Sequence, residues 1–260
     1  MSILTVTIIQ SNIFWENKRA NLDLFSKKIE NIQEKTEVVI LPEMFNTGFS
    51  MNPQMLAENM NGETVNWMKR ISAEQKIILT GSIIIEDDSK FYNRLIWMLP
   101  NGESGFYDKR HRFAYANEHT HFSSGSKRLI ASVKGWKINL QVCYDLRFPV
   151  WAKQQTADEY DVLIYVANWP GKRGIAWKTL LQARAIENQC YVIGVNRVGE
   201  DGNGISYSGD SMIIDPLGEI LYQKTIDEDI FTYALDKEKL LVVRQQFPFI
   251  KDSDSFTINL

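Results

Sequence analysis

The spacing of apolar residues switches repeatedly between strand and helix patterns, and this alternation limits the fold more than any other feature. Leu4–Gln10 alternates apolar and polar residues as a strand does, whereas Asn17–Glu34 has apolar residues near helical spacing. Further strands are expected at Val38–Leu41, Ile77–Ile85, Phe91–Leu99, Arg128–Val133, Lys137–Val142, Val162–Ala167, Tyr191–Asn196, Ser211–Ile214, Glu219–Gln223 and Asp229–Leu235. Further helices are expected at Glu63–Gln75, Ala176–Asn188 and Asp236–Val243. Successive strands between helices favour two packed sheets with helices outside over a simple βαβ repeat.

Composition places the chain among ordinary globular proteins. Its 260 residues show no linker or repeat, so one domain over residues 1–260 is predicted. A net charge of -3 gives no electrostatic reason for nucleic acid or an anionic membrane as partner. Cys143 and Cys190 form no CxxC pair, which argues against a zinc site and a disulfide framework. No apolar stretch approaches the roughly 20 residues of a membrane span, and the N-terminal segment does not read as a signal peptide, so the cytoplasm is the predicted location.

Three polar residues stand out because each follows or ends a short apolar or aromatic stretch. They are Glu43 after the strand Val38–Leu41, Lys109, and Cys143 after the strand Lys137–Val142. Ligands of α/β sheets bind beyond the carboxyl ends of strands. Taken singly, each residue has an ordinary interpretation: a buried inert cysteine, a surface carboxylate and a solvated basic cluster.

The sequence around these residues changes that interpretation. Residues 41–49 (LPEMFNTGF), 107–111 (YDKRH) and 142–149 (VCYDLRFP) resemble, in order, the glutamate, lysine and nucleophile motifs of the nitrilase superfamily. Residues 165–170 (YVANWP) and 196–199 (NRVG) resemble its omega-amidase branch, whose members hydrolyse the terminal amide of 2-oxo acids such as 2-oxoglutaramate. The resemblance implies a four-layer α-β-β-α sandwich, a small amide as substrate, no metal or organic cofactor, and a homodimer or larger assembly.

The resemblance also assigns chemical roles. Cys143 would attack the amide carbon after Glu43 has taken its proton, and Lys109 would stabilise the oxyanion together with the backbone N–H of Tyr144. Glu118 matches the second glutamate of the family, which would orient Lys109 or the substrate. Glu43 would then protonate the departing ammonia and activate the water that hydrolyses the thioester.

Substrate recognition is predicted from charge. A 2-oxo acid amide carries a carboxylate, which a forked guanidinium binds well. Arg173 is the first candidate and Arg147 the competing one, although a structural ion pair is the favoured interpretation of Arg147. Trp169 and Phe45 are candidates for the walls of the pocket, with a place in the core as the alternative.

Several other functions remain open at this point. The chain could be a carbamoyl-amine hydrolase, a nitrilase or a non-catalytic scaffold with the same fold. A metal site at His119 and His121 lacks acidic or cysteine partners at ligand spacing. A Cys–His mechanism through His111 or His119 lacks a recognisable nucleophile signature.

Overall fold

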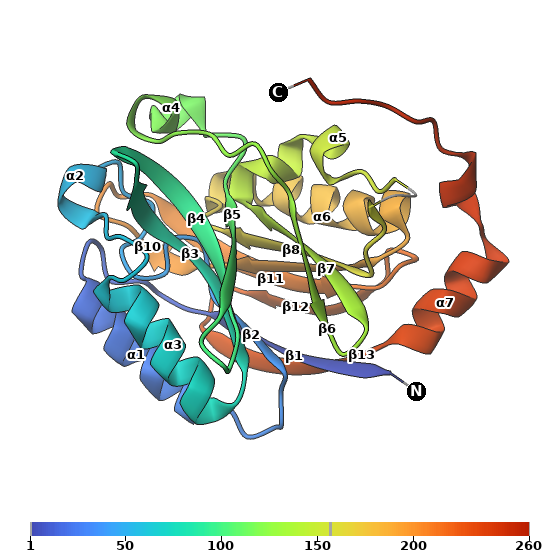
Figure 1. The fold of residues 1–260 in the computed structure, drawn as a ribbon, viewed down its shortest axis with the longest axis horizontal. Coiled ribbons are helices and arrows are strands. Elements are labelled where there is room, and N and C mark those ends of the chain that lie inside the picture. Colours follow the sequence, from blue (N-terminus) through green and yellow to red (C-terminus); the bar gives the residue numbers. More distant parts are fainter. Residues whose placement is uncertain (1, 156–157, 260) are drawn as a thin grey trace.

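A computed structural model describes residues 2–155 and 158–259 of the chain (Figure 1). The first sheet has the strand order β13-β1-β2-β3-β4-β5. Its strands are β1 (Ile3–Gln10), β2 (Val38–Ile40), β3 (Ile78–Asp87), β4 (Lys90–Met98), β5 (Ser104–Asp108) and β13 (Asp229–Asp236). The strands β1, β2 and β3 are parallel to one another, and β13, β4 and β5 are added in antiparallel steps.

The second sheet has the order β10-β11-β9-β8-β7-β6, with β12 paired to β11. Its strands are β6 (Leu129–Val133), β7 (Trp136–Val142), β8 (Val162–Ala167), β9 (Tyr191–Asn196), β10 (Val198–Glu200), β11 (Ser206–Ile214) and β12 (Ile220–Thr225). The strands β7, β8 and β9 are parallel. An antiparallel hairpin joins β6 to β7 and turns at Lys134 and Gly135, both with positive φ as a two-residue hairpin loop requires.

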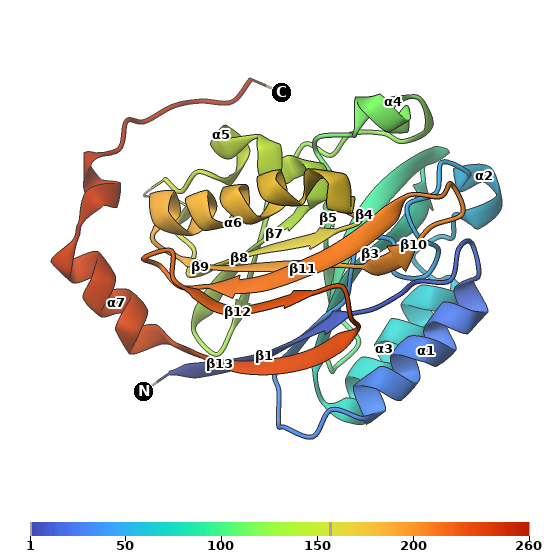
Figure 2. The ribbon, with the colours of Figure 1, turned by 180° about the vertical axis from the view of Figure 1, so that it is seen from behind.

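Helices cover the outer faces of both sheets (Figures 1 and 2). The helices α1 (Lys18–Glu30) and α3 (Glu63–Gln75) lie together on the first sheet, and α6 (Gly174–Asn188) lies on the second. Four shorter helices are α2 (Pro53–Leu56), α4 (Glu118–His121), α5 (Pro149–Ala152) and α7 (Lys237–Gln246). The predicted α-β-β-α sandwich is therefore confirmed.

Two apolar clusters hold the layers together. One joins both sheets, with Leu4 and Val6 of β1 in the same cluster as Ile138 and Leu140 of β7. The other lies beneath α1 and α3, where Phe25 is completely buried. Fully burying a side chain of this kind contributes roughly 1.5–3 kcal/mol, so the amphipathic faces fix where each helix lies.

The sheet topology brings several strand ends to one place. Glu43 follows β2, Lys109 follows β5, Cys143 follows β7 and Asn168 follows β8. Because β4 and β5 each reverse direction relative to their neighbour, β5 runs the same way as β2. Parallel strands present their carboxyl ends at the same edge of a sheet, so Glu43 and Lys109 lie at one edge of the first sheet, and Cys143 and Asn168 at one edge of the second. A hydrogen bond from the backbone N–H of Asn168 to Glu43 shows that the two edges meet.

Candidate active site

A buried ammonium group lies between two buried carboxylates. Lys109 Nζ is 2.9 Å from Glu43 Oε1, and 3.0 and 2.9 Å from the two carboxylate oxygens of Glu118. All three side chains are almost completely excluded from solvent. Buried charges need partners of this kind, because removal from water is costly for an ion that stays unpaired.

The charges in this cluster depend on one another. Burial alone would lower the pKa of Lys109, but the attraction of Glu118 and then of Glu43 outweighs it and raises that pKa, so the ammonium form is firmly held. Burial raises the pKa of Glu118, against the attraction of Lys109, and the negative charge of Glu43 raises it further. The lysine is therefore a fixed cation that does not exchange protons near neutral pH.

Two asparagines hold the Glu43 carboxylate. Asn93 Nδ2 in β4 donates to Glu43 Oε1 at 2.7 Å, and the backbone N–H of Asn168 donates to Glu43 Oε2 at 2.8 Å. The amide of Asn168 also donates to the backbone carbonyl of Glu43. Sequence reasoning singled out neither asparagine. Asn93 was a polar residue within the predicted strand Phe91–Leu99, and Asn168 lay directly after the apolar strand Val162–Ala167, within the family-like segment 165–170.

Cys143 begins a 3-10 helix, η2 (Cys143–Arg147), directly after β7. Its φ of 44° lies in the left-handed region, which is uncommon for a residue with a side chain and turns the thiol out of the strand. Sγ lies 4.0 Å from the carbonyl oxygen of Asn168. Tyr144 follows in the first turn, where backbone N–H groups have no intrahelical acceptor.

The environment keeps the resting thiol protonated. Burial raises the pKa of Cys143, and the negative charge of Glu43 and a hydrogen bond to it raise the pKa further, against the effect of Lys109. A thiolate could therefore form here only by transfer of this proton to a neighbouring group. Glu43 is the neighbouring carboxylate that can accept that proton.

Asp145 joins the lysine segment to the cysteine turn. This completely buried carboxylate accepts hydrogen bonds from the Tyr107 hydroxyl at 2.7 Å, the backbone N–H of His111 at 2.9 Å and the backbone N–H of Val142 at 3.1 Å. Ring nitrogen Nδ1 of His111 lies 2.8 Å from Asp145 Oδ1. The network fixes the spacing between the segments that carry Lys109 and Cys143.

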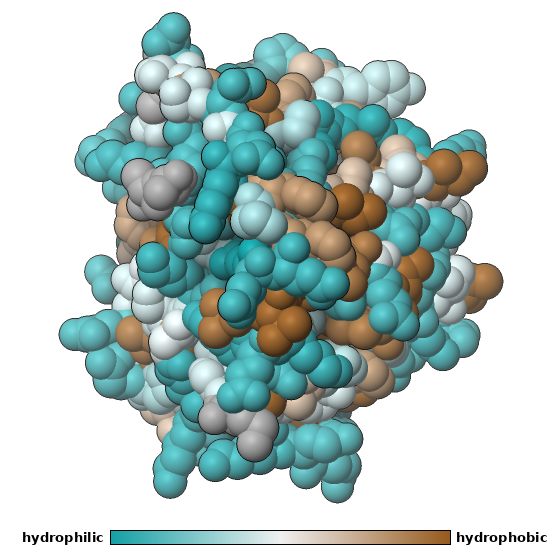
Figure 3. Space-filling view, turned by 90° about the vertical axis from the view of Figure 1, so that its right-hand side faces the viewer, coloured by the Kyte–Doolittle hydropathy of each residue, from teal (hydrophilic) through white to brown (hydrophobic). Residues whose placement is uncertain are grey.

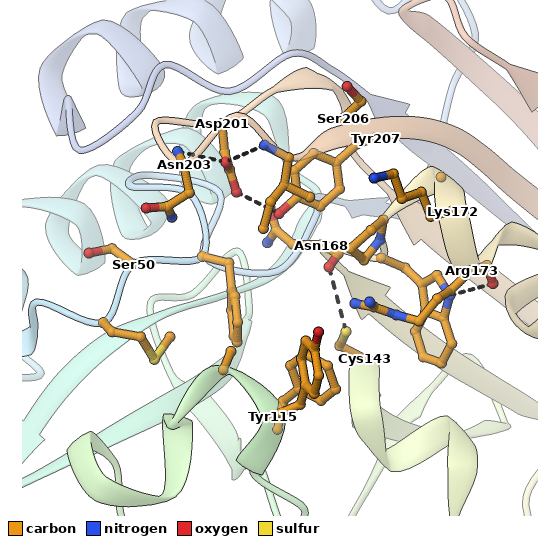
Figure 4. Close-up of a pocket in the computed structure, with 18 of the residues that line it drawn as sticks. Ser50, Tyr115, Cys143, Asn168, Lys172, Arg173, Asp201, Asn203, Ser206 and Tyr207 are labelled. Atoms are coloured by element: carbon orange, nitrogen blue, oxygen red, sulfur yellow. Dashed lines mark hydrogen bonds between the residues drawn. The ribbon is translucent and has the colours of Figure 1, made fainter.

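Cys143 opens into a cavity of about 1010 Å³ (Figure 4). Tyr144, Trp169 and Arg173, the predicted substrate-contacting residues, all line this cavity. Arg173 lies with its guanidinium carbon 5.1 Å from the centre of the Phe113 ring. Lys172 and Arg147 also line the cavity, so three cationic side chains stand on its wall.

Two predictions about individual residues need correction. Phe45 is completely buried in the apolar cluster beneath α1 and α3, with its ring centre 5.5 Å from that of Phe25, and it does not line the cavity. Arg147 forms no ion pair within residues 2–155 and 158–259 and instead lies 5.0 Å from the centre of the Trp169 ring. The only carboxylate in η2, Asp145, already accepts hydrogen bonds from other groups. The exposed side chain of Arg147 lines the cavity instead.

Within residues 2–155 and 158–259, no histidine forms a hydrogen bond to the Cys143 thiol. Nδ1 of His111 bonds to Asp145, and its ring stacks on Phe148 with centres 3.8 Å apart. His119 and His121 lie on α4, and the described part of the chain contains no group of three metal-ligating side chains. The geometry therefore favours Glu43 over a histidine as the base for Cys143.

The chain belongs to the carbon-nitrogen hydrolase family, whose profile matches residues 5–245. It is 44% identical to the omega-amidase YafV of Yersinia enterocolitica, over 99% of this chain and 100% of the relative. It is 32% identical to the 2-oxoglutaramate amidase of Bacillus subtilis, over 95% of this chain and 96% of that enzyme. A crystal structure of a CN-hydrolase superfamily protein from Xanthomonas campestris, with an arsenic adduct in its active site, has a TM-score of 0.97 at 41% identity, with both chains covered completely.

Proposed function

We propose that this hydrolase cleaves the terminal amide of small 2-oxo dicarboxylic acid monoamides, such as 2-oxoglutaramate and 2-oxosuccinamate, to the diacid and ammonia. The observation that carries the proposal is a cysteine beside a buried carboxylate–ammonium pair, at the base of a cavity whose wall bears Arg147, Lys172 and Arg173. The cationic wall suits a carboxylate-bearing substrate. The names of the relatives in Yersinia enterocolitica and Bacillus subtilis support the same substrate class.

In the first half of the reaction, Glu43 accepts the thiol proton and the sulfur of Cys143 attacks the amide carbon. The carbonyl oxygen becomes an oxyanion, which Lys109 Nζ and the backbone N–H of Tyr144 stabilise. Losing one such donor typically costs about 3–4 kcal/mol of transition-state stabilisation. Glu43 then transfers its proton to the nitrogen, the C–N bond breaks, and ammonia leaves a thioester on Cys143.

In the second half, Glu43 removes a proton from water, which attacks the thioester carbon. The C–S bond breaks, the proton on Glu43 passes to the sulfur, and the acid departs, so the thiol and the Glu43 carboxylate are both restored. Glu118 acts through Lys109, because both of its oxygens contact Nζ and the backbone N–H of Phe113 donates to it as well. It positions the ammonium group throughout both halves.

Ammonia release from 2-oxoglutaramate tests this function directly, measured beside glutamine, a simple nitrile and a carbamoyl amine. We expect 2-oxoglutaramate to give the highest kcat/KM by at least about tenfold, because only this substrate combines a terminal amide with a 2-oxo acid that the cationic wall can bind. Faster turnover of the nitrile or the carbamoyl amine would contradict the assigned substrate class.

Replacing Arg173 with alanine should impair substrates that carry a carboxylate. A hydrogen bond to a charged group contributes about 1.5–3 kcal/mol, so KM for 2-oxoglutaramate should rise about 10–100-fold. A neutral amide of similar length should show little change. Steady-state kinetics of Arg173→Ala and of the matched variant Arg147→Ala, with both substrates, separate the two candidates. Equal effects of Arg173→Ala on the charged and neutral amides would refute its role.

We also propose a cytoplasmic homodimer. No helix within the described residues is long and apolar enough to cross a membrane. Apolar side chains are exposed among hydrophilic ones on the surface that carries α7 and the C-terminal segment (Figure 3). Leu241, Val242 and Phe249 are each more than half exposed there. Such side chains favour association with a second copy. Light scattering after gel filtration distinguishes a dimer from a monomer.

A further inference from the structure

The cavity at Cys143 is larger than the proposed substrate needs. Its volume of about 1010 Å³ is at the upper end of the roughly 300–1,000 Å³ found for pockets that hold drug-sized ligands. A molecule as small as 2-oxoglutaramate fills only a part of such a space. The remainder has its own lining and its own charge.

The two ends of the cavity differ in chemistry. Lys172 and Arg173 lie at one end, and Ser50 and Asn203 lie on the opposite side of Cys143 (Figure 4). We name the second end the distal lobe and define it by the cavity-lining residues Trp15, Glu16, Ser50, Met51, Asn52 and Asn203. The six residues of the distal lobe include the carboxylate of Glu16, several neutral polar groups and no cationic side chain. The Asp201 carboxylate beside Asn203 also lines the cavity, and it accepts hydrogen bonds from the backbone N–H of Asn203 and the hydroxyl of Tyr207.

The proposed function puts the substrate carboxylate against Lys172 and Arg173, so the distal lobe, on the opposite side of Cys143, is the side on which the nitrogen would depart. Lys109, which holds the base Glu43, has its Nζ 5.1 Å from the centre of the Phe49 ring. Phe49 lines the cavity and is followed directly by Ser50, Met51 and Asn52. With the substrate carboxylate bound at the cationic end, a substituent on the departing nitrogen would point away from that end, toward Phe49 and the distal lobe.

Glu16 is held in place at the distal lobe. Its backbone N–H donates to the carbonyl oxygen of Thr47 at 2.8 Å, and the Ser50 hydroxyl donates to Oε1. Within residues 2–155 and 158–259, no group donates to the other oxygen, Oε2. A positioned carboxylate with a vacant oxygen can accept a hydrogen bond from an ammonium or hydroxyl group on a ligand.

We propose that the distal lobe is a subsite for the leaving amine, so that the enzyme also hydrolyses N-substituted 2-oxo acid monoamides whose short alkyl substituent ends in an ammonium or hydroxyl group. This inference rests on the proposed function. Cys143 sulfur bonds to the amide carbon, the C–N bond breaks, and the proton held by Glu43 moves to the departing amine. Water then hydrolyses the thioester, and the products are the 2-oxo diacid and a primary amine.

The test compares four amides of 2-oxoglutarate: the unsubstituted amide and the N-(2-aminoethyl), N-(2-hydroxyethyl) and N-(2-carboxyethyl) amides. Release of 2-oxoglutarate is measured for each. We expect kcat/KM for the aminoethyl amide to be within about tenfold of that for the unsubstituted amide, and at least about tenfold above that for the carboxyethyl amide, which would bring a second anion to Glu16.

Glu16→Gln supplies the second part of the test, with Glu200→Gln as a matched control. Glu200 is an exposed carboxylate at the end of β10 that does not line the cavity. Glu16→Gln should lower the ratio of kcat/KM for the aminoethyl amide to that for the unsubstituted amide about tenfold, whereas Glu200→Gln should keep the ratio of the natural sequence. Because the ratio is taken within one preparation, partial unfolding of a variant does not change it.

The outcomes separate the subsite from the proposed function. Turnover of the unsubstituted amide with no turnover of the aminoethyl and hydroxyethyl amides would overturn the subsite and leave the function intact. Equal rates for the aminoethyl and carboxyethyl amides, or a ratio that Glu16→Gln leaves unchanged, would also overturn it. No turnover of the unsubstituted amide would overturn the proposed function itself.

Discussion

Replacing Cys143 with alanine is expected to abolish ammonia release from 2-oxoglutaramate, with a loss of kcat on the order of 10⁴–10⁶-fold, as for other enzymes that lose their nucleophile. Without sulfur no thioester can form, and the buried pair of Glu43 and Lys109 has no bond-forming partner. The variant should keep its fold, because the thiol is a small group whose contact with the carbonyl oxygen of Asn168, at 4.0 Å, is weak. Single-turnover measurements with excess enzyme would detect a residual rate, and a loss of less than about tenfold would contradict a nucleophilic role.

Cys190 provides the matched control for this experiment. It is completely buried in the apolar core, away from the cavity, and burial raises its pKa. Cys190→Ala should lower the free energy of unfolding by about 1 kcal/mol, the usual cost of a core change of this size, and leave kcat unaltered. Iodoacetamide at neutral pH should label Cys143 in the folded protein and spare Cys190. The reverse pattern would place the reactive thiol elsewhere.

Replacing Lys109 with methionine is expected to damage both stability and catalysis. The substitution leaves Glu43 and Glu118 buried without their shared cation, and breaking a buried ion pair from one side typically costs about 3–5 kcal/mol. It also removes a donor to the oxyanion, which should lower kcat about 10²–10³-fold. Urea unfolding gives the first quantity and steady-state kinetics the second.

A second substitution distinguishes charge from packing. In the double variant Lys109→Met/Glu118→Gln, a neutral amide replaces one of the two carboxylates that have lost their cation. Part of the lost free energy of unfolding should therefore return, while kcat stays low. Glutamine can still accept the hydrogen bond from the backbone N–H of Phe113. If the double variant is no more stable than Lys109→Met alone, the loss comes from packing around the lysine and the electrostatic account is wrong.

Most strands and helices were predictable because their residues are buried on one or both faces. Two strands, β5 and β10, were not predicted from the sequence, and each lies at the edge of its sheet. In β5 only Tyr107 is buried, and in β10 only Val198 is buried. An edge strand with so little buried surface shows no regular alternation of apolar residues, so sequence periodicity does not reveal it.

Residues of the candidate site were predictable where a sequence motif fixed the residue type. They were not predictable where the role depends on which way the side chain points. Glu43, Lys109 and Glu118 come together as expected. Phe45 lies two residues from Glu43, yet its side chain enters the core, because a turn after a strand does not fix which way each residue faces. Asn93 could not be selected either, since one polar residue in a strand does not show which distant carboxylate it contacts.

The pairing of β1 with β13 has a consequence for biosynthesis. Ile3 lies opposite Asp236 and Gln10 lies opposite Asp229. During synthesis, β1 therefore cannot form this pairing until β13 has also left the ribosome. Until then β1 presents an open edge to other nascent chains, and closing so long a loop of chain slows folding. The first sheet therefore closes after almost all of the chain has been translated, and a chain released before β13 is made leaves this edge unpaired and prone to aggregate.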